Sequence, residues 1–293
     1  MNDFQKLIAE ICNECGYEYN LVSNNWINMI TYQNKTKIIA GHKFDLNTVG
    51  ITQVLDDKFA LYDVLKHFNI PIINHHLIYK DTEWSDVLDL YNKYNQKLVV
   101  KVNNGSCGRG VYYVNNESEL KESCEEIFLH RNSLSITPYL DIKREYRIIV
   151  LDKEIKLIYG KIKPIVIGDG IKTIKELLLE FNEPFFKNVD VEDKVLAKDE
   201  EYVYNWQFNL SKGAVSTLEV DEKTKEKLLE IVDKILNKID IRFCSIDIIE
   251  VNKEFQVLEM NSGVMMDNFM HQHPNSRNIA KNIYKEAIQK MFE

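Results

Sequence analysis

Apolar residues recur every three or four positions in several stretches of the chain, a spacing that predicts amphipathic helices. The clearest are residues 1–15, 57–68 and 221–238. Asp57 stands where its side chain can cap the second of these helices, and Pro71 requires that helix to end earlier. Shorter helices are expected over 82–94 and 171–181 and from residues 116 and 276 onward.

Between these helices lie runs with the composition and alternation of β-strands. They cover residues 97–102, 111–114, 133–140, 145–151, 154–162, 244–251 and 254–261. We therefore predict an α+β protein with at least two sheets. Its expected parts are a short N-terminal α/β segment (1–55) and a larger domain (56–293), divided into a lobe with a glycine-rich loop (56–136) and a second lobe (137–293).

Composition and charge limit the partners of this chain. Its 293 residues are 45% hydrophobic with a net charge of −8, which argues against a general nucleic-acid binder. An anionic ligand would need a local basic cluster, and residues 141–163 hold seven Lys/Arg against four acids. The chain lacks a signal-peptide pattern and any apolar run long enough to cross a membrane. Five cysteines, an odd number, suggest reduced thiols and a cytoplasmic location, and we expect Cys12 and Cys15 to lie on one helix without metal.

The last predicted hairpin places two acids and an amide together. Glu259 and Asn261 are two residues apart on one strand, so their side chains leave the same face. If residues 252–254 form a three-residue loop, Asp247 falls directly opposite Glu259 and all three side chains converge. Two facing carboxylates repel unless a cation lies between them, and three oxygen ligands suit Mg²⁺. The alternative, that one acid points to solvent, stays open on spacing alone.

A glycine-rich loop follows the strand that ends near Lys101. Glycines from Gly105 to Gly110 would let backbone amides approach phosphate oxygens, although a plain hairpin turn would use the same residues. The sequence does not match the Walker phosphate-binding motif. On the strand 145–151, Glu145 and Arg147 share one face, where they could serve a charged ligand or form a structural ion pair.

The order of these motifs resembles that of the ATP-grasp enzymes, in the branch of cyanophycin synthetase and the C-terminal ligase part of bifunctional glutathione synthetases. The resemblance runs from about Thr52 to the C-terminus. It rests on Lys58 in DDKFALYDVL, Lys101 in LVVKVNNGSCGRGV, REYRIIV, KIKPIVIGDGIKTIKELL, NLSKGAVS, SIDIIE and VLEMNSG. It implies an ATP-grasp fold, in which a nucleotide is held between two α+β lobes.

The resemblance also implies a role for each matching residue. Lys58 and Lys101 would contact ATP phosphates, and the flexible loop that closes over them would be formed by Gly105, Ser106, Gly108, Arg109 and Gly110. Glu145 and Arg147 would line the site. Lys161 and Asn209 would lie near the acyl phosphate or acceptor, with Ala214 replacing a family glycine. The implied ligands of Mg²⁺ or Mn²⁺ are Asp247, Glu259 and Asn261.

Two departures from the family pattern affect these expectations. Thr137 stands where an acid near the adenine is common, and the first segment is shorter than the usual leading domain, which suggests a stand-alone module. The expected activity is ATP-dependent carboxylate–amine ligation through an acyl phosphate, releasing ADP and phosphate. An ATP-grasp kinase and a non-catalytic nucleotide-binding module are the alternatives.

The expected substrates are small molecules or peptides, with no nucleic acid or membrane partner, and a homodimer is left open. His271 and His273 would either contact the acceptor, bind metal or pack against the last helix. Met265, Met266 and Met270 are expected to fill the core.

Overall fold

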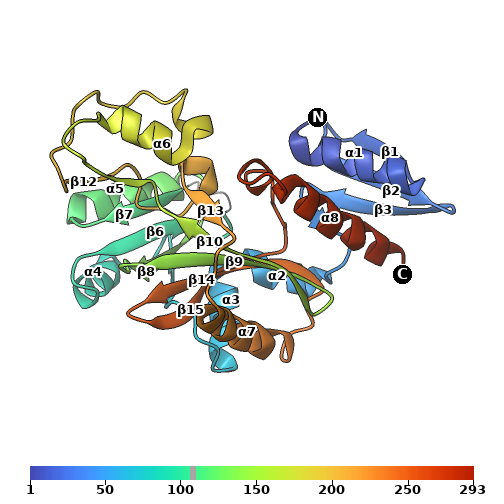
Figure 1. The fold of residues 1–293 in the computed structure, drawn as a ribbon. Coiled ribbons are helices and arrows are strands. Elements are labelled where there is room, and N and C mark those ends of the chain that lie inside the picture. The colour runs from blue at the N-terminus through green and yellow to red at the C-terminus, as the bar shows by residue number, and fades with distance from the viewer. Residues whose placement is uncertain (106–109) are drawn as a thin grey trace.

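The computed structural model describes residues 1–105 and 110–293 (Figure 1). Ser106, Gly108 and Arg109, which we assigned to the phosphate loop, lie outside the described residues. The described residues form four antiparallel sheets with helices packed around them.

The N-terminal part combines one helix with a small sheet. Helix α1 (Asp3–Cys15) begins at Asn2, whose side chain accepts a hydrogen bond from the Gln5 amide. Cys12 and Cys15 both lie on this helix, as predicted. The sheet has the order β1-β2-β3-β4 and is formed by β1 (Glu18–Val22), β2 (Ile27–Tyr32), β3 (Lys35–Ala40) and β4 (Lys43–Phe44). The C-terminal helix α8 (Ser276–Phe292) packs against α1 and this sheet, so the first and last helices of the chain lie side by side (Figure 1).

The next part contains the strands around the glycine-rich loop. After α2 (Val49–Asp56), helix α3 (Lys58–His67) begins at Asp57, which caps it through the Ala60 amide and confirms the sequence prediction. The sheet has the order β5-β8-β6-β7. Its elements are β5 (His76–Tyr79), α4 (Trp84–Lys93), β6 (Leu98–Val102), β7 (Val111–Val114), α5 (Glu117–Phe128) and β8 (Ser133–Pro138).

A five-stranded sheet of order β13-β10-β9-β14-β15 forms the centre of the molecule (Figure 1). Its strands are β9 (Arg144–Leu151), β10 (Glu154–Ile162), β13 (Val215–Thr217), β14 (Phe243–Val251) and β15 (Glu254–Asn261). The β9–β10 turn is tight, with Asp152 and Lys153 both at positive φ.

A smaller unit lies between β10 and β13. It contains β11 (Ile165–Ile167), α6 (Ile174–Phe186), β12 (Glu201–Val203) and the short helix η1 (Leu210–Lys212), and α7 (Glu222–Leu236) follows β13. Helix α6 starts three residues later than predicted because Thr173 and Glu176 form a capping box.

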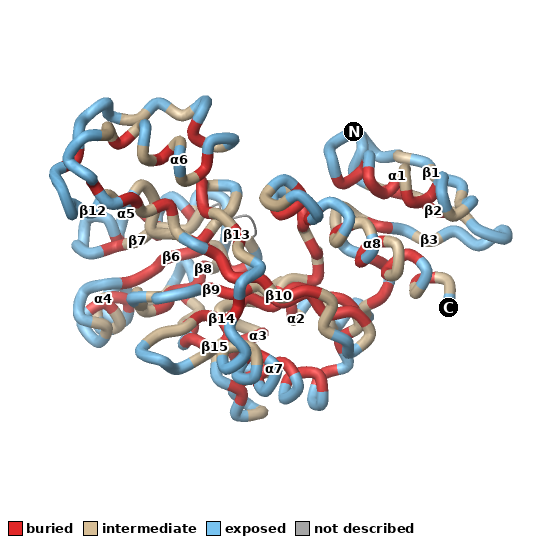
Figure 2. Tube along the Cα trace, in the orientation of Figure 1, coloured by how far each residue is buried: buried red, intermediate tan, exposed pale blue. Residues whose placement is uncertain are grey.

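Both faces of the five-stranded sheet are covered, which accounts for its buried strands (Figure 2). One face packs against α7 and α3 through residues such as Ile148, Ile246 and Leu228. Part of the other face, including Ile149 and Phe243, joins the core made with α1 and α8. The rest of that face carries polar side chains. Within the described ranges, the helices are all too short or too polar to span a bilayer.

Candidate active site

The β14–β15 hairpin positions the predicted acidic residues by a different route from the one we expected. The loop has two residues, Asn252 and Lys253, both at positive φ, so the prediction of a three-residue loop was wrong. Val251 therefore pairs with Glu254. The register then shifts between Asp247 and Ile248, and Asp247 still lies opposite Glu259, as predicted.

A β-bulge at Leu258 causes this shift. Without the bulge, the two-residue turn would place Leu258 opposite Asp247, and Glu259 and Asn261 would face the hydrophobic core. With the bulge, Leu258, Glu259 and Asn261 all line the same cavity, whereas Val257 is fully buried beneath the sheet. The extra residue therefore adds a hydrophobic side chain to the cavity wall and keeps the polar ones there.

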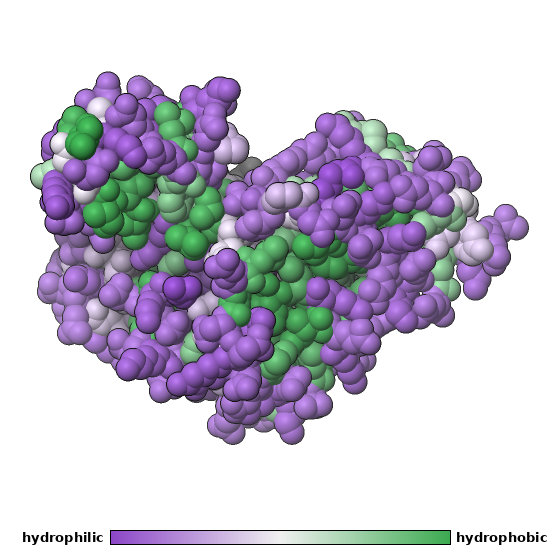
Figure 3. Space-filling model, viewed as in Figure 1, coloured by the Kyte–Doolittle hydropathy of each residue, from purple (hydrophilic) through white to green (hydrophobic). Residues whose placement is uncertain are grey.

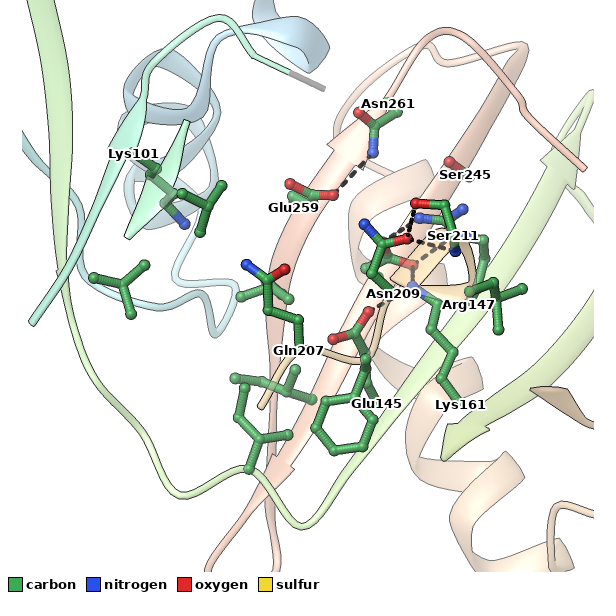
Figure 4. Close-up of a pocket in the computed structure, with 18 of the residues that line it drawn as sticks. Lys101, Glu145, Arg147, Lys161, Gln207, Asn209, Ser211, Ser245, Glu259 and Asn261 are labelled. Carbon is green, nitrogen blue, oxygen red and sulfur yellow. Dashed lines mark hydrogen bonds and ion pairs between the residues drawn. The ribbon is translucent and has the colours of Figure 1, made fainter. Parts of the chain in front are cut away.

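Charged side chains form a row across the sheet at this level. Arg147 on β9 pairs with Asp247 on β14, which pairs in turn with Glu259 on β15. Two nitrogens of the Arg147 guanidinium donate to the Asp247 carboxylate, at 2.8 and 2.5 Å. Lys161 on β10 donates to Glu145 at 2.5 Å and to Asp247 at 3.1 Å (Figure 4). Two cations and two carboxylates thus alternate in one buried network. Arg147 and Glu145 do not pair with each other, because Arg147 pairs with Asp247 and Glu145 pairs with Lys161.

Burial and charge shift the pKa values in this network. Burial raises the pKa of Glu145 to about 7, and Lys161 opposes the shift. Burial would also raise the pKa of Asp247, but Arg147 and Lys161 outweigh it and lower that pKa to about 2. Asp247 is therefore ionised at neutral pH, and its charge is held by the two cations.

Two buried lysines form the opposite wall. Lys58, the first residue of α3, donates to the carbonyls of Asn103 (3.4 Å) and Gly105 (2.6 Å), at the start of the glycine-rich loop. Lys101 on β6 is only 6% exposed. Burial, with the nearby charge of Lys58, lowers the pKa of Lys101 to about 7. Two cations brought together out of water provide a site for an anionic group.

The cavity between these walls has a volume of about 280 Å³ (Figure 4). It is lined by ten of the predicted site residues, namely Lys58, Lys101, Gly105, Glu145, Arg147, Lys161, Asn209, Asp247, Glu259 and Asn261. Gly110, which has a positive φ, is not among the lining residues. Of the seven basic residues in 141–163, Arg147 and Lys161 line the cavity.

Sequence reasoning missed three parts of the wall. The end of β8 and the residues after it, namely Pro138, Tyr139, Leu140 and Ile142, line one end next to Thr137, together with Ile73, Val99 and Leu258. Ser245 pairs with Asn261 and could have been found from the same hairpin register. Met265 lines the cavity instead of filling the core, because its extended segment alternates, whereas Met266 and Met270 are buried as predicted.

The two histidines after the hairpin do not line the cavity. His271 faces Asp3 at 3.1 Å on the surface. The ring of His273 contacts the Ser216 hydroxyl at 2.9 Å, which ties the segment to β13. Neither of these contacts involves the cavity, so a structural role fits both residues.

The oxygen atoms around Glu259 supply some of the ligands that a divalent cation needs. Asn261 donates weakly to Glu259 at 3.5 Å, and both side chains point into the cavity, where an ion bridging phosphates would lie. Asp247 faces the same space, but both of its oxygens accept hydrogen bonds from cations. In the described ranges, acids, histidines and cysteines nowhere gather in threes around a metal-sized site. A divalent cation at Glu259 would therefore need carboxylate, amide and phosphate oxygens together as its ligands.

Comparison with known proteins gives consistent matches. Residues 55–162 match the model of the RimK-like ATP-grasp domain. The glutathione biosynthesis bifunctional protein GshAB of Clostridium perfringens is 22% identical over 286 residues, covering 87% of this chain and 36% of the relative. The chain thus spans about a third of that protein's length.

Solved structures agree in fold at low sequence identity. A bifunctional glutathione synthetase from Pasteurella multocida matches with a TM-score of 0.56 and 17% identity, covering 98% of this chain and 44% of the other. D-alanyl-alanine synthetase A from Vibrio cholerae matches with a TM-score of 0.58 and 12% identity, over 98% and 96% of the two chains.

Proposed function

Because this chain has the ATP-grasp fold and contains a RimK-like ATP-grasp domain over residues 55–162, we propose that it is an ATP-dependent carboxylate–amine ligase. The observation that carries this proposal is the cavity itself. It places Lys58 and Lys101 on one wall and the Arg147–Asp247–Glu259 row on the other. We assign residues 56–293 to this catalytic domain.

The two lysines would hold the phosphates of ATP. Their charges repel each other, and Lys101 has a lowered pKa. A polyphosphate between them would remove this repulsion and restore the charge of Lys101. Backbone amides next to Gly105 and Gly110 would add hydrogen bonds.

Glu259 and Asn261 would hold Mg²⁺ or Mn²⁺, with Asp247 completing the set if Arg147 and Lys161 release one of its oxygens. A bound ion would neutralise phosphate charge and align the nucleotide. The hydrophobic end of the cavity, with Ile73, Val99 and Leu258, would receive the adenine.

The chemistry requires positive charge beneath the reacting groups. A carboxylate is a poor electrophile at neutral pH, and phosphoryl transfer from ATP converts it into an acyl phosphate with a good leaving group. Arg147, Lys161 and Asn209 would stabilise the charge on this intermediate, and the cavity would limit its hydrolysis. Attack by an amine would then form the amide and release phosphate.

The substrates we propose are small molecules or peptides, since the chain has a net charge of −8 and no general nucleic-acid binding is expected. A cytoplasmic location is supported by the thiols of Cys12, Cys15, Cys124 and Cys244, which are free.

The test is an incubation with ATP, Mg²⁺ and a pool of amino acids and short peptides. Mass spectrometry should detect a product lighter by one water than the sum of two pool members, with an equal amount of free phosphate. Phosphate retained on a product would instead indicate a kinase. A parent enzyme that neither releases phosphate nor modifies the pool would contradict the proposal.

Glu259→Gln tests the assignment of the site. We expect a loss of turnover on the order of 100-fold, because a neutral amide holds a divalent cation poorly. Glu254→Gln is the matched control on the same strand, since Glu254 is exposed and lies outside the cavity. Equal turnover in the two variants would exclude Glu259 from the site.

A further inference from the structure

The row of cavity-facing residues continues beyond the end of β15. Alternate residues from Glu259 onward line the cavity, namely Glu259, Asn261, Gly263, Met265 and Asp267. The residues between them are buried, namely Met260, Ser262, Val264 and Met266. Residues 262–267 therefore keep the two-residue alternation of a strand, although they form no ladder. Asp267 is the last side chain of this row.

Hydrogen bonds fix this segment at successive residues. The Ser262 hydroxyl donates to Asp56 at 2.8 Å, and the Ser262 amide donates to the same carboxylate at 3.2 Å. The buried Tyr284 hydroxyl donates to the Val264 carbonyl at 2.9 Å and accepts from the Met266 amide at 3.0 Å. The segment is thus held from α2 on one side and α8 on the other, which fixes where Asp267 can point.

His42, from the turn between β3 and β4, fixes the Asp267 side chain itself. Its Nε2 lies 3.0 Å from Asp267 Oδ2, and because a carboxylate only accepts, this nitrogen carries the proton. The His42 ring packs on Phe4, with centroids 4.3 Å apart. Across 1–105 and 110–293, His42 supplies the one hydrogen bond to this carboxylate, through Oδ2. Oδ1 can therefore accept from a ligand in the cavity.

The other carboxylates of the cavity have different partners. Glu145 and Asp247 accept from Lys161 and Arg147, and Glu259 contacts Asn261. Among the acids that the structure describes around the cavity, only Asp267 lies beyond the five-stranded sheet. Strands β15 and β9 run in the same direction. The 137–142 segment comes before the start of β9, whereas the residues past Asn261 follow the end of β15. The two segments therefore lie at opposite ends of the cavity.

We propose that Asp267 binds the ammonium group of the acceptor substrate and that His42 is its positioning residue. This inference rests on the proposed ligase function, for which the acceptor must be an amine. Free amines are cationic near neutral pH, and a fixed carboxylate at the cavity end opposite the adenine would select them and orient the nitrogen. The acceptor class is therefore a primary amine that enters as the ammonium ion, such as an amino acid. It gives up one proton to solvent before its nitrogen attacks the acyl carbon, and the phosphate group leaves as the C–O bond breaks.

The test compares a charged and an uncharged nucleophile. The full chain is incubated with ATP, Mg²⁺ and the pool of amino acids and dipeptides, with or without hydroxylamine, which is uncharged near neutral pH and traps acyl phosphates as hydroxamates. For Asp267→Asn we expect hydroxamate formation within about twofold of the parent, but dehydrated amine product reduced at least about tenfold. Raising the pool concentration should restore part of the product, because the defect is in KM.

Three variants complete the comparison. Asp267→Glu should recover part of the amine product, because it keeps the charge. His42→Gln should raise KM for the amine without changing hydroxamate formation. Asp45→Asn, at an exposed acid of the same N-terminal part, should match the parent in both assays. Thermal melting of each variant checks folding.

The outcomes separate the two proposals. If Asp267→Asn lowers both products by the same factor, or neither, the acceptor assignment is overturned while the ligase function stands. If the parent makes neither hydroxamate nor dehydrated product, the ligase proposal fails and the acceptor assignment fails with it.

Discussion

Replacing Lys101 by methionine should stabilise the protein while weakening ATP binding. Lys101 is 6% exposed, and burial together with the charge of Lys58 lowers its pKa from 10.5 to about 7. Neither Glu145 nor Glu259 compensates, although both favour its charged form. Methionine has a similar length and no charge, so Lys101→Met removes the ammonium without leaving a large cavity.

The magnitude follows from the pKa shift. Each pKa unit corresponds to about 1.4 kcal/mol, so the shift from 10.5 to about 7 amounts to roughly 5 kcal/mol at most. Because the pKa of Lys101 is lowered in the folded state, burying the charged ammonium costs stability. This penalty is absent at pH values above the pKa of Lys101 in the unfolded chain, about 10.5. It grows as the pH falls from about 10.5 to 7 and is constant below. Water that enters the cavity would reduce this penalty. We therefore expect Lys101→Met to raise the free energy of unfolding by about 2 kcal/mol or more at pH 7.

Urea unfolding at pH 7 and pH 10 measures this gain. The difference between Lys101→Met and the parent should be largest at pH 7 and fall below about 1 kcal/mol at pH 10. ATP with Mg²⁺ should stabilise the parent more than the variant. The exposed Lys97→Met serves as a control and should stay within about 0.5 kcal/mol at both pH values. A Lys101→Met variant that is less stable, or whose gain is independent of pH, would refute the reasoning.

Two further predictions concern stability. Asp247→Asn should lower the free energy of unfolding by about 3–5 kcal/mol, because it leaves buried cations without their counter-charge, and urea unfolding at neutral pH would measure this. A loss of less than about 1 kcal/mol in Asp247→Asn would show that water already screens the charges of the network. Gly110→Ala should destabilise by about 1 kcal/mol or more, because Gly110 has a φ of +61° and a Cβ there would lie 2.7 Å from Val102 Cγ2. Gly50→Ala, in open space on α2, should instead stabilise slightly, and equal effects would argue against backbone strain at Gly110.

A bound polyphosphate is expected to stabilise the protein. Lys58 and Lys101 are buried close together, and the other wall carries a compensated network. Such an arrangement stores electrostatic repulsion that a polyphosphate would relieve. The ligand would therefore stabilise the whole fold, and the two lysines account for that coupling.

Local patterns predicted most elements because their causes are local. Asp57 caps α3 as its position before the helix suggested, and apolar spacing located α7 and α8 closely. The start of α6 was misplaced by three residues because apolar spacing does not show the Thr173–Glu176 capping box, which sets the first residue of the helix. The predicted length of the loop at Asn252 and Lys253 was also wrong, because two-residue and three-residue hairpin loops differ by only one residue.

The sequence by itself determined the fold class, the motifs that supply the candidate site and the pairing of Asp247 with Glu259. The pairing survived a wrong loop because polar residues must face the cavity, and this requirement fixes the register through the Leu258 bulge. Only the tertiary structure decided that Asp247 contacts Arg147 and Lys161 and that His42 reaches Asp267, 225 residues away. Alternation and spacing act over a few residues, whereas these contacts depend on how separate elements pack.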